Sequence, residues 1–178
     1  MSFARLRSAP TGSRRRANWK PAAKAGTGYG IGFARYKNTG AYCAVVAEIE
    51  GEEDISVRKL TIAVDVGEAI NPDGVINQIE GGAIQATSWA LKERVRFDGQ
   101  RITSNTWTDY PILRFSEVPE VQVEVIARPE MVPVGAGEAA HGPATAAIAN
   151  AVFDCLGVRV RNLPITRDSL IAAMELST

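Results

Sequence analysis

Residues 135–143, with the sequence GAGEAAHGP, place an ionisable side chain where it could do chemistry. Gly135, Gly137 and Gly142 allow the backbone to approach a ligand closely or to take a positive φ. Glu138 is a carboxylate in this glycine loop, and a carboxylate held in place can act as a general base. An ordinary strand-to-helix turn with a solvated glutamate would have the same sequence, so the loop alone leaves both interpretations open.

The sequence lacks the common patterns of other catalytic and metal sites. His141 is the single histidine, and we expect it to be a hydrogen-bonding loop residue. Cys43 and Cys155 form no C-x-x-C pair, which argues against a structural zinc or iron–sulfur site and favours two small, reduced, buried residues. No serine stands in a G-x-S-x-G motif, and the phosphate-binding pattern G-x-x-x-x-G-K-[ST] is absent. We therefore predict no metal ligands in this chain.

Length and composition are those of one globular domain, with 178 residues, 46% hydrophobic and 22% charged. The net charge is zero but unevenly spread, because residues 1–24 carry seven of the 20 bases and none of the 20 acids. We predict a basic, flexible arm over residues 1–26 and one domain over 27–178. Such an arm could contact nucleic acid, although a flexible arm without a partner is the simpler interpretation. No apolar run reaches the roughly 18 residues of a membrane span and no export signal is evident, so we expect a cytoplasmic location.

Strands and helices interleave without regular βαβ alternation, which predicts an α+β, two-layer domain with a mixed sheet packed against helices. Residues 28–36 alternate glycine with larger apolar residues and leave room for close backbone approach. Residues 42–49 are a β-rich run after a turn at 38–40, so the two segments predict a hairpin. Further strands are predicted over 57–66 and 121–127.

The helix signals lie in the second half of the chain. Residues 71–74 form a loop-type break in which Asn71 is a turn residue, and apolar residues then recur at helical spacing from about 75 to 93. Gly81 and Gly82 inside this helix indicate that something packs close to its backbone. Further helices are predicted from about 143 to 156 and after Thr166, the expected N-cap of the last helix.

Four blocks of sequence point to a known family. They are residues 32–42 (GFARYKNTGAY), 65–72 (DVGEAINP), 78–85 (QIEGGAIQ) and 134–138 (VGAGE). Together they resemble the C-terminal part of the molybdopterin-binding large subunit of the xanthine dehydrogenase/aldehyde oxidase family, and in particular the isoquinoline 1-oxidoreductase-like subunits. One block alone would be weak, but four in the family's order cover about five-sixths of the chain.

The resemblance implies a role for several residues. It implies that Glu138 is the general base beside a molybdenum cofactor, in the hydroxylation of an aldehyde or N-heterocycle carbon with water-derived oxygen. It implies that Gln78 hydrogen-bonds the pterin, and that Gly135 and Gly137 belong to the cofactor-binding loop. We expect the Glu138 loop to be poor in water, as suits a base.

Subunits of this family are several times longer than this chain, and the resemblance implies that preceding segments supply much of the pocket. We therefore expect a C-terminal fragment that is inactive alone and holds no molybdopterin by itself. The partners implied are the missing N-terminal part of the large subunit and an iron–sulfur subunit that accepts electrons. An alternative is a non-catalytic module that binds the cofactor or a partner. Aromatic residues left on a former interface would favour a homodimer, and the candidates are Trp89, Trp107, Tyr110 and Phe115.

Overall fold

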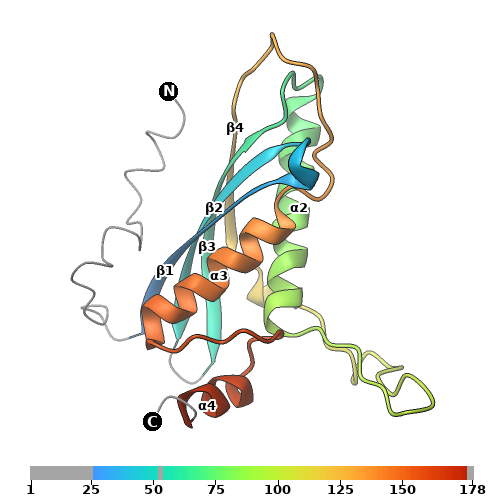
Figure 1. The fold of residues 1–178 in the computed structure, drawn as a ribbon, viewed down its shortest axis with the longest axis vertical. Coiled ribbons are helices and arrows are strands. Elements are labelled where there is room, and N and C mark those ends of the chain that lie inside the picture. The colour runs from blue at the N-terminus through green and yellow to red at the C-terminus, as the bar shows by residue number, and fades with distance from the viewer. Residues whose placement is uncertain (1–25, 52–53, 176–178) are drawn as a thin grey trace.

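The structure is a computed structural model that describes residues 26–51 and 54–175. The predicted basic arm therefore lies, apart from Gly26, outside the described residues. Four strands form one sheet in the order β1-β2-β3-β4, as Figure 1 shows. Their bounds are Thr27–Arg35 for β1, Tyr42–Gly51 for β2, Ile55–Asp65 for β3 and Glu120–Val125 for β4.

Helices α2 (Pro72–Leu91) and α3 (His141–Leu156) pack on the sheet, and α4 (Arg167–Glu175) lies at one end (Figure 1). The first three strands are antiparallel and β4 runs parallel to β3. This arrangement confirms the predicted α+β domain with a mixed sheet. Among the described residues, no helix is long and apolar enough to cross a membrane.

The core lies between the sheet and the two long helices. Strand residues such as Val45, Ile49 and Leu60 are fully buried against small helix residues such as Ala83 and Ala147. Alternate strand positions supply the apolar face, as a pleated sheet requires. Small residues on the helices let the helix axes approach the sheet closely, so the alanine-rich composition of α3 serves the packing as well as helix propensity.

The glycines of β1 place α3 directly on the strand. A Cβ atom at Gly28, Gly30 or Gly32 would overlap backbone atoms of α3, which confirms the predicted close approach. On the same edge, the side chain of Asn150 donates to Ile31 O at 2.9 Å, and the Tyr29 N–H donates to Asp154 Oδ2 at 2.9 Å. Helix α3 therefore also satisfies two backbone groups on the free edge of β1, which would otherwise be unpaired.

Helix α2 begins at Pro72, three residues earlier than predicted. Asn71 is its N-cap, and the Asn71 side chain accepts a hydrogen bond from Gly74 N at 3.1 Å. Pro72 fits the first turn because its missing N–H has no intrahelical partner there. The interpretation of residues 71–74 as a loop was wrong, since the same residue types serve as a helix start. Thr166 is a cap as predicted, because its hydroxyl accepts from Ser169 N at 3.3 Å.

Between α2 and β4, residues 92–119 form an excursion whose middle part extends away from the body of the domain (Figure 1), while the bonds from Leu113 N to Ser88 Oγ and from Lys92 to Glu117 hold its returning end at the end of α2. It contains the short 3₁₀ helix η3 (Phe115–Glu117). Trp107 is 80% exposed and Phe115 is 99% exposed, so neither belongs to the core of this chain. Seven of the large apolar side chains that are exposed among the described residues lie on this excursion; they are Val95, Phe97, Ile102, Trp107, Ile112, Phe115 and Val118.

Candidate functional site

Glu138 lies on the segment between β4 and α3, three residues before the first residue of α3. Its side chain is exposed, so the expected water-poor surroundings are not provided by residues 26–51 and 54–175. The Tyr36 hydroxyl, from the 3₁₀ helix η2 (Tyr36–Asn38), donates a hydrogen bond to Glu138 Oε2. Glu138 Oε1 has no partner among the described residues.

The glycines around Glu138 leave open space beside the backbone. Among the described glycines, a positive φ occurs at Gly26, Gly67 and Gly157, and not in the Glu138 loop. A Cβ at Gly135, Gly137 or Gly142 would meet no atom within 4 Å. Neither backbone conformation nor packing within the described chain therefore requires glycine at these three positions. The explanation that fits glycine at these positions is that another group approaches the backbone of this loop closely.

Gln78 reaches this loop from α2. Its side-chain Nε2 donates to Gly137 O at 2.8 Å, so the structure brings Gln78 and the Glu138 loop together across 59 residues of sequence. The Gln78 side chain is exposed, and its Oε1 has no partner among the described residues. Gln78 therefore anchors the loop and keeps a free acceptor beside it.

His141 is a hydrogen-bonding residue as expected, but it is the first residue of α3 and not a loop residue. Its Nε2 lies 3.1 Å from Gln85 Oε1, and its ring lies against Trp89 with 5.0 Å between ring centroids. A Cβ at Gly82 would stand 3.0 Å from His141 Cε1, which explains the close packing predicted at that helix glycine. Gly81, by contrast, faces open space.

Two concave surfaces adjoin one another, and Glu138 lines one of them. One, of about 420 Å³, is lined by the end of β1, by η2, by Trp89 and by the start of α3. The other, of about 450 Å³, runs along the outer face of α3 towards Leu163. They share Trp89, His141 and Gly142, so the glutamate stands at one end of a continuous, mostly apolar surface. Mostly apolar concavities with a few polar groups are the usual form of ligand sites.

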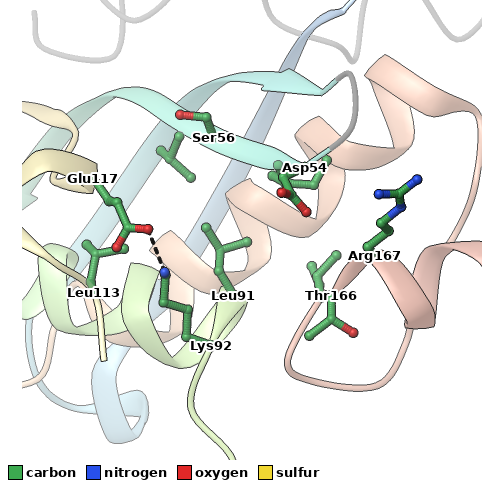
Figure 2. Close-up of a pocket in the computed structure, with 11 residues that line it drawn as sticks. Asp54, Ser56, Leu91, Lys92, Leu113, Glu117, Thr166 and Arg167 are labelled. Atoms are coloured by element: carbon green, nitrogen blue, oxygen red, sulfur yellow. Dashed lines mark hydrogen bonds and ion pairs between the residues drawn. The ribbon is translucent and has the colours of Figure 1, made fainter. Parts of the chain in front are cut away.

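A third pocket, of about 370 Å³, lies elsewhere and shares no residue with these two (Figure 2). It is formed by the start of β3, the end of α2 and the start of α4. Lys92 Nζ lies 2.6 Å from Glu117 Oε1 across it, and this ammonium holds the pKa of the Glu117 carboxyl below its ordinary value. This pocket is therefore separate from the concavity that Glu138 lines.

Tyr36 and Trp89 are site residues to which sequence patterns gave no functional role. Tyr36 lies within one of the four family blocks, but it is 102 residues from Glu138 and no local spacing links the two. Within residues 26–51 and 54–175, no group of three or more histidine, cysteine or acidic side chains could hold a metal ion. The polar groups of the site are thus a carboxylate, an amide, a phenol and an imidazole, together with the cationic side chains of Arg35 and Lys37. Together the fold and the site define a ligand-binding domain of the α+β class.

Comparison with known proteins identifies the family. Residues 3–119 match the molybdopterin cofactor-binding domain. The chain is 40% identical over 156 residues to a nicotinate dehydrogenase subunit of Pseudomonas putida, and 36% identical over 152 residues to the beta subunit of isoquinoline 1-oxidoreductase from Brevundimonas diminuta. The crystal structure of quinoline 2-oxidoreductase from Pseudomonas putida 86 superposes with a TM-score of 0.66 at 29% identity. The chain therefore belongs to the molybdopterin cofactor-binding domain family of the xanthine dehydrogenase/aldehyde oxidase type.

The chain spans a small part of these proteins. The two sequence alignments each cover 83% of this chain, but 13% and 19% of the relatives. The superposition covers 76% of this chain and 18% of quinoline 2-oxidoreductase. The family match includes Gln78 and ends before Glu138, and it begins within residues 1–26, which the charge distribution sets apart as an arm.

Proposed function

We propose that the chain is the cofactor-binding domain of a molybdenum hydroxylase that inserts water-derived oxygen into a substrate carbon. The relatives include proteins named for nicotinate and isoquinoline and others named for aldehydes, so the proposed substrate is an N-heterocycle or an aldehyde. The observation that carries the proposal is the convergence of Gln78 and Glu138 at a glycine loop whose outer side is open.

The residues present fit a pterin cofactor. The open faces of Gly135 and Gly137 would let a flat ligand lie against the backbone. Gln78 Oε1 would accept a hydrogen bond from the pterin while Nε2 keeps the loop in place. The molybdenum cofactor, when bound, would supply the two-electron redox chemistry that protein side chains lack.

In this proposal Glu138 is the general base. Its carboxylate would accept a proton at Oε1 from the water-derived oxygen nucleophile, while Oε2 stays bonded to the Tyr36 hydroxyl. The remainder of the large chain would cover the site and exclude water, because Glu138 is exposed in this chain alone. We accordingly expect no hydroxylase turnover, and no molybdenum retained after dialysis, from the chain by itself.

The test is Glu138→Gln in the molybdenum-loaded enzyme that contains this chain. The amide keeps the shape of the side chain and removes the base, so we expect kcat to fall by about 10⁴-fold, the upper end for general bases. The molybdenum content, measured by mass spectrometry, should stay the same. Unchanged turnover per molybdenum would refute the assignment of Glu138.

Gln78→Ala should behave differently. It removes a cofactor contact and the loop anchor, so we expect lower molybdenum occupancy with turnover per bound molybdenum closer to normal. Gln100→Ala is the matched control, because Gln100 is exposed on the distant excursion. Equal occupancy in the Gln78 and Gln100 variants would show that Gln78 does not hold the cofactor.

A further inference from the structure

Tyr36 is held in place by hydrogen bonds of its own backbone. Its N–H donates to Ala41 O at 2.9 Å, and its carbonyl accepts from Gly40 N at 2.8 Å. The next two residues, Lys37 and Asn38, take positive φ values of 48° and 61°, which turns the chain sharply beneath the ring. Non-glycine residues seldom adopt this conformation, and they do so mainly where the surrounding structure holds them.

Packing fixes the ring as well as the backbone. A Cβ at Gly40 would lie 3.3 Å from Tyr36 Cδ1, so the absence of a side chain there makes room for the ring. Lys37, the next residue of η2, has its Nζ 5.2 Å from the centroid of the Tyr36 ring. The ring is half-buried, and its hydroxyl is the end that reaches the Glu138 loop.

The Glu138 loop is consequently held from two sides. Gln78, on α2, holds the backbone at Gly137 O, and Tyr36, on η2, holds one oxygen of the carboxylate. The two contacts come from two different elements, α2 and η2, which both lie near the start of α3 (Figure 1). A carboxylate with Oε2 fixed by a donor has a defined direction for Oε1, which is the oxygen left to take a proton.

We infer that Tyr36 is a positioning residue for Glu138, an inference that rests on the proposed function of Glu138 as the base. The Tyr36 hydroxyl fixes the rotamer of the carboxylate and presents Oε1 to the open side of the glycine loop. Tyr36 transfers no proton itself, because it donates to Oε2 both before and after Oε1 accepts one.

The first test uses the chain itself and needs no cofactor. In a chain labelled with ¹³C at the glutamate side-chain carboxyls, the Glu138 signal is assigned by its loss in Glu138→Gln. Tyr36→Phe keeps the ring and removes the hydroxyl, so we expect the Glu138 signal to shift and the other glutamate signals to stay. Tyr42→Phe is the matched control, because it removes the same hydroxyl from a tyrosine whose ring stacks on Phe33 and lies beneath Arg35. An unmoved Glu138 signal in Tyr36→Phe would overturn the inference.

The second test uses the molybdenum-loaded enzyme. Misplacement of a catalytic group by about 1 Å can cost 10²-fold in rate, so we expect Tyr36→Phe to lower kcat about 10- to 100-fold with KM unchanged. Tyr42→Phe should match the wild type. If Glu138→Gln abolishes turnover and Tyr36→Phe does not lower kcat, positioning by Tyr36 is wrong and the proposed base stands. If Glu138→Gln is fully active, the proposed function itself fails.

Discussion

Cys43, on β2, shows how burial alone sets the chemistry of a side chain. It is 1% exposed, and burial raises the pKa of its thiol to about 12. Cys155 is half-buried, and burial raises the pKa of its thiol as well. Both cysteines are free; Cys43 is buried as expected, whereas Cys155 is only partly buried, contrary to the expectation. Since the thiolate is the reactive form, neither residue is built to be a nucleophile.

This burial makes a prediction for thiol labelling. At pH 8, below the raised pKa, the Cys43 thiol stays protonated, and its thiolate fraction grows only as pH rises towards 12. With a thiol reagent we expect the folded chain to be labelled slowly, at Cys155 before Cys43. In guanidinium, which unfolds the chain, we expect both thiols to be labelled immediately. Cys155→Ser should leave a folded chain almost without reaction. Rapid labelling of Cys43 in the folded state would contradict the burial.

At this scale, sequence reasoning located Glu138 but not its surroundings. The glycine loop and the family blocks pointed to Glu138 and Gln78, because their chemistry is local to a short motif. Tyr36 was missed because its contact with Glu138 depends on how η2 folds back against the start of α3. The exposure of Glu138 was also missed, since a sequence shows a loop but not what covers it.

Among the elements, β1 and α2 both contain glycine, but the surroundings of these glycines are opposite. Gly30 lies beneath the backbone of α3, and Gly81 has open space where a side chain would be. We expect Gly30→Ala to lower the free energy of unfolding by about 3 kcal/mol or more, because the methyl overlaps backbone atoms that cannot move aside. Gly81→Ala should raise it by about 1 kcal/mol through helix propensity.

Urea denaturation followed by circular dichroism measures both changes in the same chain. The two substitutions add the same methyl group, so each is the control for the other. A destabilised Gly81→Ala chain would mean that α2 is crowded there. A fully stable Gly30→Ala chain would mean that α3 does not lie on β1 as described.

Most elements could be predicted because their patterns are local. Glycine alternation in β1 and apolar spacing in α2 survive in the structure, since each strand or helix buries the face that its sequence makes apolar. The start of α2 was misplaced because Asn-Pro-Asp-Gly serves equally as a turn and as a capped first helical turn. The parallel pairing of β4 with β3 follows from the crossover of α2 and the excursion, which no local pattern specifies.

For the whole molecule, the excursion is the feature most open to association. Phe97, Trp107 and Phe115 are each more than three-quarters exposed, and exposed apolar surface promotes contact with other chains. We expect the chain alone to form dimers at high concentration, as measured by sedimentation velocity. The double substitution Trp107→Ser and Phe115→Ser should shift the chain to monomer.

Val132→Ser is the control for this experiment, because Val132 is 80% exposed but lies outside the excursion. It should leave the dimer intact. A wild-type chain that stays monomeric at every concentration would contradict the prediction, and the excursion would then need a different explanation.

The dependence of β1 on α3 also has a consequence for synthesis of the chain on the ribosome. The Tyr29 N–H bonds to a carboxylate 125 residues further along, which at about 5–20 residues per second is made roughly 6–25 s later. During that interval the glycine-bearing face and the free edge of β1 have no helix to cover them. A nascent chain in this state resembles an open template for strand addition. Stalled nascent chains that end before α3 (His141–Leu156) should therefore crosslink more strongly to a chaperone than nascent chains in which α3 has left the ribosome.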